Sequence, residues 1–147
     1  MAEEIPPRLP ERPRLLGVDY GRVRIGLAVS DALGIDAKPL GFLRRTTDAQ
    51  AAQMVAAVAI KEKVGGIVLG LPLNADGSKG GNVRWVRAFR TELAKATKLP
   101  ITLVDERYSS EEAEEELRLR GKMPKERGWI DAQSAVIVLR RHLAGEA

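Results

Sequence analysis

Three apolar runs near the start of the chain are separated by short polar breaks. Residues 14–20 and 24–29 predict two strands, and the turn near Gly21 between them predicts an antiparallel hairpin. A third run, at about 39–45, predicts a strand that completes a meander. A charged residue, Asp19, interrupts the first run. Because a charge inside a buried strand is costly unless something compensates it, Asp19 needs a partner or a function.

After the third run the apolar positions change to helical spacing. Met54, Val55 and Val58 lie on one face of a predicted helix, which Thr47 or Asp48 can cap at its start. We therefore expect this helix to bury that face against the sheet.

Two continuous apolar runs follow, with a second predicted helix between them. The runs "IVLGLP" (67–72) and "ITLVDE" (101–106) show no alternation, which is typical of strands covered on both faces. The helix between them is expected over about 82–97. The sequence "SSEE" (109–112) predicts a capping box, with Ser109 as the N-cap of a third helix.

A last helix is expected from about Ile130 to His142, after a basic loop. The element order is then β-β-β-α-β-α-β-α-α. This order predicts an α/β fold with a mixed five-stranded sheet, three antiparallel strands followed by two parallel ones, and helices on both faces. Residues 1–13 hold four prolines and are expected to be a disordered tail, so the folded domain is expected to span 14–147.

Composition narrows the class of protein. The length of 147 residues suits one domain, and the absence of cysteine excludes disulfides and thiolate metal sites. No apolar run reaches the roughly 18–20 residues needed to cross a bilayer, and the first residues lack a signal-peptide pattern. We therefore expect a cytoplasmic protein with no membrane association.

Positive charge is concentrated in turns and loops. Lys and Arg number 24 against 20 acidic residues, a net charge of +4. The basic stretches are "GRVR" (21–24), "LRR" (43–45) and "RLRGKMPKERG" (118–128). They fit an anionic partner such as nucleic acid, or simply a solvated surface. Aromatic residues are few, so a row of stacking aromatics for single strands is not expected.

Acidic residues from three remote segments stand where open α/β sheets form their sites. Asp19 is near the end of the first strand, Asp105 and Glu106 end the last strand, and Asp131 opens the last helix. Clustered carboxylates tolerate one another when divalent cations neutralise them, and oxygen ligands without Cys or His suit Mg²⁺ or Mn²⁺. Such ions can support phosphodiester cleavage. Each acid alone also has a structural interpretation, as a turn former, a helix-dipole partner or an ion pair with Arg107.

Four ordered motifs, "GVDYGRVRIGLAVSD", "GLPLNADGS", "VDERYSS" and "WIDAQSAVIVL", resemble those of the YqgF family. These small bacterial proteins are described as Holliday junction resolvases and as pre-16S rRNA nucleases. The resemblance extends from Leu15 to Leu143, and the family's ribonuclease H-like fold agrees with the element order. It implies a metal-dependent endonuclease acting on structured nucleic acid, either an rRNA precursor or branched DNA, as a monomer or a homodimer.

The same resemblance implies roles for individual residues. Asp19, Glu106 and Asp131 match the catalytic acids, which would also be the ligands of Mg²⁺ or Mn²⁺. Strand alternation puts Asp105 and Glu106 on opposite sides without saying which side is the site, so the choice of Glu106 rests on the family motif. Residues expected to contact substrate are Arg22, Arg24, Asn74, Lys79, Arg107, Lys122, Lys125 and Arg127. The single histidine, His142, is expected at the surface or a helix end.

Two other functions stay open at this point. The first motif also resembles the phosphate loop of actin-like ATPases and sugar kinases. Those proteins need two such domains, and they have small residues where this chain has Arg22, Val23 and Arg24. The other alternative is a non-catalytic nucleic-acid-binding domain of ribonuclease H-like fold. The presence of all three acids favours catalysis.

Overall fold

The computed structural model describes residues 13–72 and 81–145. Residues 1–12 of the expected tail lie outside this part, and so do two of the expected substrate-binding residues, Asn74 and Lys79. Within the described ranges, no helix combines the length and apolar character that a membrane crossing requires.

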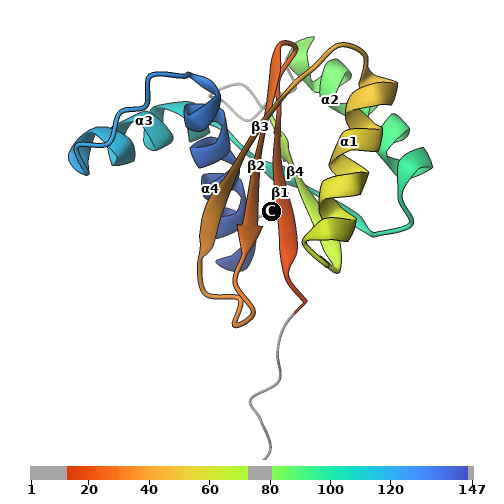
Figure 1. Cartoon of the computed structure of the whole chain (residues 1–147), viewed down its shortest axis with the longest axis horizontal. Coiled ribbons are helices and arrows are strands. Elements are labelled where there is room, and N and C mark those ends of the chain that lie inside the picture. Colours follow the sequence, from red (N-terminus) through yellow and green to blue (C-terminus); the bar gives the residue numbers. More distant parts are fainter. Residues whose placement is uncertain (1–12, 73–80, 146–147) are drawn as a thin grey trace, which may run out of the picture.

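A five-stranded mixed sheet forms the centre of the molecule (Figure 1). Its strands are β1 (Leu15–Tyr20), β2 (Arg24–Ser30), β3 (Ala37–Arg44), β4 (Gly66–Leu71) and β5 (Ile101–Asp105). The spatial order is β3-β2-β1-β4-β5. The first three strands pair antiparallel, whereas β4 runs parallel to both β1 and β5. The predicted mixed sheet is therefore confirmed.

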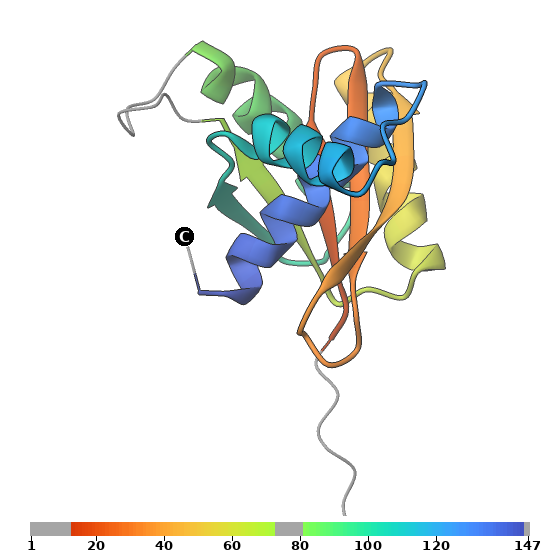
Figure 2. The ribbon, with the colours of Figure 1, turned by 90° about the vertical axis from the view of Figure 1, so that its left-hand side faces the viewer.

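Helices cover both faces of this sheet, as predicted (Figures 1 and 2). They are α1 (Asp48–Lys61), α2 (Gly81–Ala96), α3 (Ser109–Leu119) and α4 (Gly128–Leu143). The first two pack on one face, and α4 crosses the other face with α3 beside it. Thr47 is the N-cap of α1, since its side chain accepts a hydrogen bond from the backbone N–H of Gln50.

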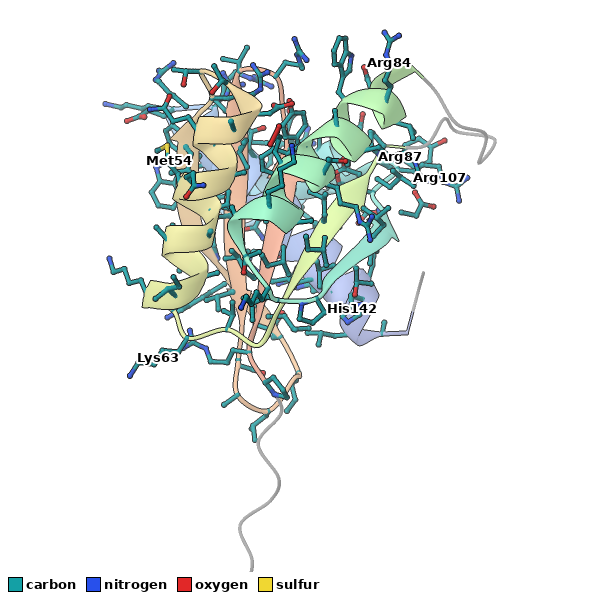
Figure 3. All side chains as sticks on the ribbon, turned by 90° about the vertical axis from the view of Figure 1, so that its right-hand side faces the viewer. Met54, Lys63, Arg84, Arg87, Arg107 and His142 are labelled. Atoms are coloured by element: carbon teal, nitrogen blue, oxygen red, sulfur yellow. The ribbon has the colours of Figure 1, made fainter. Side chains whose placement is uncertain are left out.

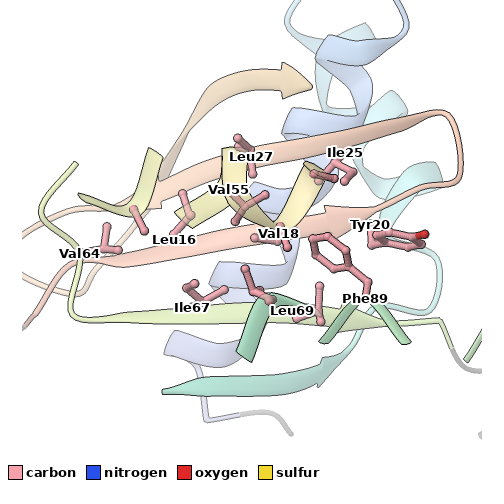
Figure 4. Packing of buried hydrophobic residues seen from close by; sticks show 14 of the residues in the cluster. Leu16, Val18, Tyr20, Ile25, Leu27, Val55, Val64, Ile67, Leu69 and Phe89 are labelled. Atoms are coloured by element: carbon pink, nitrogen blue, oxygen red, sulfur yellow. The ribbon is translucent and has the colours of Figure 1, made fainter. Parts of the chain in front are cut away.

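Strand alternation divides the side chains of β1 between the two layers. Leu16, Val18 and Tyr20 enter the core under α1 and α2, where Tyr20 packs on Phe89 with ring centroids 4.7 Å apart (Figure 4). The intervening residues, Gly17 and Asp19, therefore face α4. This alternation places the carboxyl group of Asp19 on the face of the sheet that α4 covers.

Glycines on the α4 side let that helix lie directly on the sheet. A Cβ on Gly17 would come within 2.6 Å of Leu139, and one on Gly26 would come within 2.0 Å of the carbonyl oxygen of Asp131. Gly26 is also the residue paired with Asp19 across β1 and β2. The start of α4, with Asp131, is thus held close to Asp19 because Gly26 has no side chain.

The predicted capping box at the start of α3 is wrong. The N-cap residue is Tyr108, in the left-handed conformation with φ 62°, and it makes no side-chain capping bond. Ser109 is instead the first helical residue, and it is buried. The chain turns sharply after β5, with the Ser109 N–H donating to the Glu106 carbonyl, and this turn draws Ser109 inward.

Two burial predictions also need correction. The strand β5 is not covered on both faces, because it is an edge strand and Thr102 is exposed. Met54 lies on the outer side of α1 and is 38% exposed (Figure 3). The short side chains of Ala51, Ala52 and Ala59 bring α1 close to the sheet, so Met54 is not needed to fill the core.

Candidate active site

The structure brings Asp19 and Glu106 together although 86 positions separate them in the sequence (106 − 19 − 1). Asp19 is on β1 and Glu106 follows β5, so the strand β4 lies between them. A Cβ on Gly70 of β4 would lie 2.5 Å from Glu106 Oε2. The missing side chain at Gly70 therefore gives Glu106 room to lie across β4 toward Asp19.

The two carboxyl groups have strongly perturbed acidities. Burial raises the pKa of Asp19 to about 6. Hydrogen bonding with Glu106 opposes this increase, and the charge of Asp131 adds to it. Burial, the charge of Asp19 and hydrogen bonding with Asp19 together raise the pKa of Glu106 well above its ordinary value. Both carboxyls therefore bind protons more tightly than free carboxyls do, because two like charges held in a buried place repel each other.

Glu106 also carries the clearest sign of a missing ligand. Its side chain is buried, and Oε2 has no hydrogen-bond partner in the described part of the chain. An unpartnered buried carboxylate oxygen is costly, and a divalent cation would satisfy it. The oxygen-only donor set of Asp19, Glu106 and Asp131 suits Mg²⁺ or Mn²⁺, so the residues present fit such an ion.

Asp131 is near this pair but is engaged elsewhere. Its Oδ2 accepts from Nε of Arg24 at 2.7 Å, an ion pair between α4 and β2. Within residues 13–72 and 81–145, no three acidic, histidine or cysteine side chains already lie together as a metal cluster. The structure thus joins two of the three expected acids and holds the third beside them. The phosphate contact expected of Arg24 stays a prediction.

Asp105 has a different environment from that of Glu106. Its Oδ2 accepts from Nε of Arg107 at 2.7 Å, and its Oδ1 accepts from the Arg107 backbone N–H at 2.9 Å. Although burial opposes the effect, these hydrogen bonds and the charge of Arg107 hold the pKa of Asp105 below its ordinary value. The geometry therefore joins Glu106, and not Asp105, to Asp19.

An open cleft of about 200 Å³ contains the acid pair, and we call it the acidic cleft. Its lining includes Asp19, Pro72, Glu106, Arg107, Tyr108 and Ser109. Arg107 is thus an expected substrate-binding residue that lines the same cleft as the acid pair. A larger cavity, of about 550 Å³, is lined by Arg14, Ser30 and Asp36 at the opposite end of the sheet, and contains none of the expected catalytic acids.

The basic loop after α3 is non-helical, as predicted, and leads directly into the turn of α4 that bears Asp131. Lys122 and Lys125 are exposed, and Arg127 pairs with Glu114 at 3.3 Å on the surface. Their contact with phosphates stays a prediction. His142 lies in the last turn of α4, beside Pro13 and Leu15 and away from the acids (Figure 3).

Sequence reasoning missed Arg141. From the last turn of α4 it donates to the carbonyl oxygens of Asp105, at 2.9 Å, and Arg107, at 2.6 Å, and it pairs with Glu112. It thereby fixes the turn that presents Glu106, and its charge lowers the pKa of Glu106 against the larger opposing effects. An arginine at a helix C-terminus is common for reasons of helix dipole alone, so the sequence contains no signal of this role.

A sheet of this order, with acids on β1, directly after β5 and at the start of the helix across it, defines a ribonuclease H-like fold. The structure of Thermus thermophilus RuvC "in complex with Holliday junction substrate" has a TM-score of 0.60, covering 91% of this chain and 95% of that one at 15% identity. A second T. thermophilus RuvC structure has a TM-score of 0.55, covering 90% and 95% at 17% identity. These likenesses show the fold.

The chain belongs to the RuvX family, which is the YqgF family of the sequence resemblance. The family model, described as "Holliday junction resolvase", matches residues 13–145. A protein of Anaeromyxobacter sp. (strain Fw109-5), named "Putative pre-16S rRNA nuclease", is 46% identical over 133 residues, covering 90% of this chain and 97% of that protein. One of the same name from Synechococcus elongatus is 41% identical, covering 87% of each. The chain is therefore a member of a family of phosphodiester-hydrolysing nucleases.

Proposed function

We propose that this chain is a metal-dependent endonuclease that cuts structured RNA, with an rRNA precursor as its substrate. The observation that carries the proposal is the pair of Asp19 and Glu106 in the acidic cleft, with Glu106 Oε2 buried and unpartnered in the described residues. Membership of a nuclease family supports catalysis over the alternative of a non-catalytic nucleic-acid-binding domain.

Each residue has a part that follows from its position. Asp19 and Glu106 would hold the divalent ion, with Asp131 beside them. The ion would supply Lewis-acid activation of the attacking water and neutralise charge on the phosphate. Arg107, which lines the same cleft, would orient the phosphate, while Arg141 holds the turn between Asp105 and Arg107 in place.

The choice of an rRNA precursor rests on the names of the relatives that match most of this chain. Cleavage of a four-way DNA junction is the second candidate, and the description of the family model supports it. A junction enzyme must cut two strands symmetrically, which normally requires a two-fold dimer. A nuclease that cuts one RNA strand can act as a monomer.

The experiment is a parallel cleavage assay. A labelled pre-16S rRNA fragment, a four-way DNA junction and a blunt DNA duplex are each incubated with the protein in Mg²⁺, in Mn²⁺ and in EDTA. The proposal expects cleavage of the rRNA fragment with either metal and none in EDTA. Full activity in EDTA would contradict the metal mechanism, and cleavage of the junction alone would replace the first candidate with the second.

A further inference from the structure

A partly buried tryptophan beside the active site has two arginines against it. The guanidinium of Arg22 lies 3.8 Å from the centroid of the Trp85 ring, and that of Arg84 lies 4.9 Å from it. Part of the indole packs against the buried core under α1 and α2. We call these three residues, Arg22, Arg84 and Trp85, the stacking shelf.

The stacking shelf adjoins the acidic cleft. A second cleft, of about 140 Å³, is lined by Tyr20, Gly21, Arg22, Pro72, Asn82, Trp85 and Val86. Pro72 lines both clefts, so they meet at this residue. A nucleotide on the shelf would therefore be a close neighbour of a phosphate held at the acid pair.

The chemistry of the shelf fits a nucleobase. In the part of the chain that the structure describes, Arg22 is exposed and has no carboxylate partner. Indole rings and guanidinium planes are the surfaces on which unpaired bases stack in nucleic-acid complexes. A cation–π contact at an exposed site is weaker than a base–indole stack, so a base can displace Arg22 or stack onto it.

Basic residues lead from the shelf toward the acids. Figure 3 shows Arg84 and Arg87 along one edge of α2, with Arg107 further along the same edge of the molecule. Arg84 and Arg87 are both exposed. A phosphate backbone along this edge would pass from Trp85 to Arg107, which lines the acidic cleft.

We propose that the stacking shelf binds an unpaired nucleobase next to the bond that is cut. The substrate would then be a strand that is single or locally opened at the cleavage site, and not a continuous duplex. This inference rests on the proposed nuclease function and deepens it. Few aromatic residues are present in the chain, but one is enough for a single stacked base.

Tryptophan fluorescence tests the shelf directly, because the chain has only two tryptophans. In a Trp129→Phe background, Trp85 is the only one left. The protein is titrated in EDTA, to prevent cleavage, with a short single-stranded oligoribonucleotide, the same strand with abasic sites, and a blunt duplex of the same sequence. We expect quenching by the first probe, and little by the abasic strand or the duplex.

The affinities of Trp85 variants for the same probes test the stacking shelf independently. We expect Trp85→Ala to weaken binding of the single strand by about 5- to 100-fold, and Trp85→Phe to restore most of it. Binding of the blunt duplex should change less than about twofold, because phosphate contacts dominate it. Melting curves of both variants show whether they are folded, and the fluorescence titration of Trp85 keeps the test valid if Trp85→Ala is not.

The outcomes distinguish a failure of the stacking shelf from a failure of the proposed nuclease function. Equal quenching by the abasic strand, or unchanged affinity in a folded Trp85→Ala protein that still cuts RNA, would overturn the shelf and leave the nuclease standing. Arg22 would then only cover the indole. If the unmodified protein neither binds nor cuts any of the nucleic acids, both the nuclease and the shelf are overturned.

Discussion

Glu106 is the residue on which the proposed site depends most. Its carboxyl lies across a glycine, faces a second carboxyl and has one oxygen without a partner in the described residues. Such an arrangement destabilises the metal-free protein when both carboxyls are ionised, because like charges are held together in a buried place. The free energy of unfolding should therefore depend on pH through the ionisation of this pair.

The first prediction concerns Asp19→Asn in EDTA. The pKa of Asp19 is raised to about 6 in the folded protein, so its protonated form favours folding. That contribution is fully present below the ordinary pKa of about 4 and is lost as the pH rises through about 6. Asp19→Asn should therefore be more stable than the unmodified protein at pH 8, on the order of 1–3 kcal/mol, but not at pH 4. Urea unfolding at the two pH values measures this, and equal destabilisation at both would show a structural role for Asp19.

The second prediction concerns Gly70→Ala. The added Cβ would lie 2.5 Å from Glu106 Oε2, so the carboxyl must move away from Asp19. We expect cleavage to fall by about 10- to 100-fold while the protein stays folded, because a displacement of this kind would misplace the proposed metal ligand. Gly66→Ala is the matched control on the same strand, since its Cβ meets a flexible leucine side chain at 3.2 Å. Equal activity in both variants would mean that the position of Glu106 is unimportant.

The sequence alone could not decide which of Asp105 and Glu106 lies on the same side of the sheet as Asp19. Alternation separates Asp105 from Glu106 but does not say which side α4 covers. That side depends on the small residues Gly17, Gly26 and Gly70, whose importance appears only when β1, β2 and β4 lie next to one another. Asp19 and Asp131 could be recognised from the sequence, because a charge within an apolar strand and a charge at the start of a helix both stand out in the local pattern.

At the scale of elements, α4 and the turn after β5 position the site. The helix rests on glycines of β1 and β2, and its last turn supplies Arg141 to the carbonyl oxygens of the turn. Apolar runs predicted the strands, helical spacing predicted the other helices, and the "SSEE" sequence predicted α3, because these signals can be read locally. The capping pattern was wrong at Ser109, where the tertiary turn overrides it, and the burial expected of β5 was wrong because its edge position depends on strand order.

The third prediction concerns the basic loop. Replacing Lys122, Lys125 and Arg127 together by glutamine should weaken RNA binding and flatten its dependence on salt, because fewer counterions are released. Each lost phosphate contact should reduce the slope of log K against log salt by about 0.7–0.9. Arg127 should contribute least, because it already pairs with Glu114.

Replacing Lys61, Lys95 and Lys98 by glutamine is the control for the loop variant, since it removes the same charge from the last turns of α1 and α2 and from the loop after α2. This control should leave most of the salt slope unchanged. Equal slopes in the two triple variants would assign the loop lysines to solvation alone.

At the scale of the whole molecule, strand order converts remote sequence positions into one site. Asp19 on β1 and Glu106 after β5 are separated by a single strand, and Asp131 comes from α4, the helix that covers this face of the sheet. The predicted order of elements was sufficient to predict the mixed sheet and the helices on both of its faces. It was not sufficient for the stacking shelf, which exists only because the β1–β2 turn meets the start of α2.

The fourth prediction concerns metal binding by the folded protein. Mn²⁺ should raise the melting temperature at pH 8, because an ion that binds only the native state stabilises it, by about 2.7 kcal/mol at 100 times its Kd. The shift should disappear in Asp19→Asn and persist in Glu62→Gln. Glu62 is an acid remote from the site that pairs with Arg14. An identical shift in all three proteins would place the ion elsewhere.

The most direct test of the central claim is the rate of Mn²⁺-dependent cleavage by Glu106→Gln, measured beside Glu62→Gln on the labelled rRNA fragment. The account predicts that Glu106→Gln folds and still binds the fragment but cuts it at least about 100-fold more slowly, because it loses the charge that the ion requires. Glu62→Gln should cut at the rate of the unmodified protein. A folded Glu106→Gln protein that cuts as fast as Glu62→Gln would contradict the account.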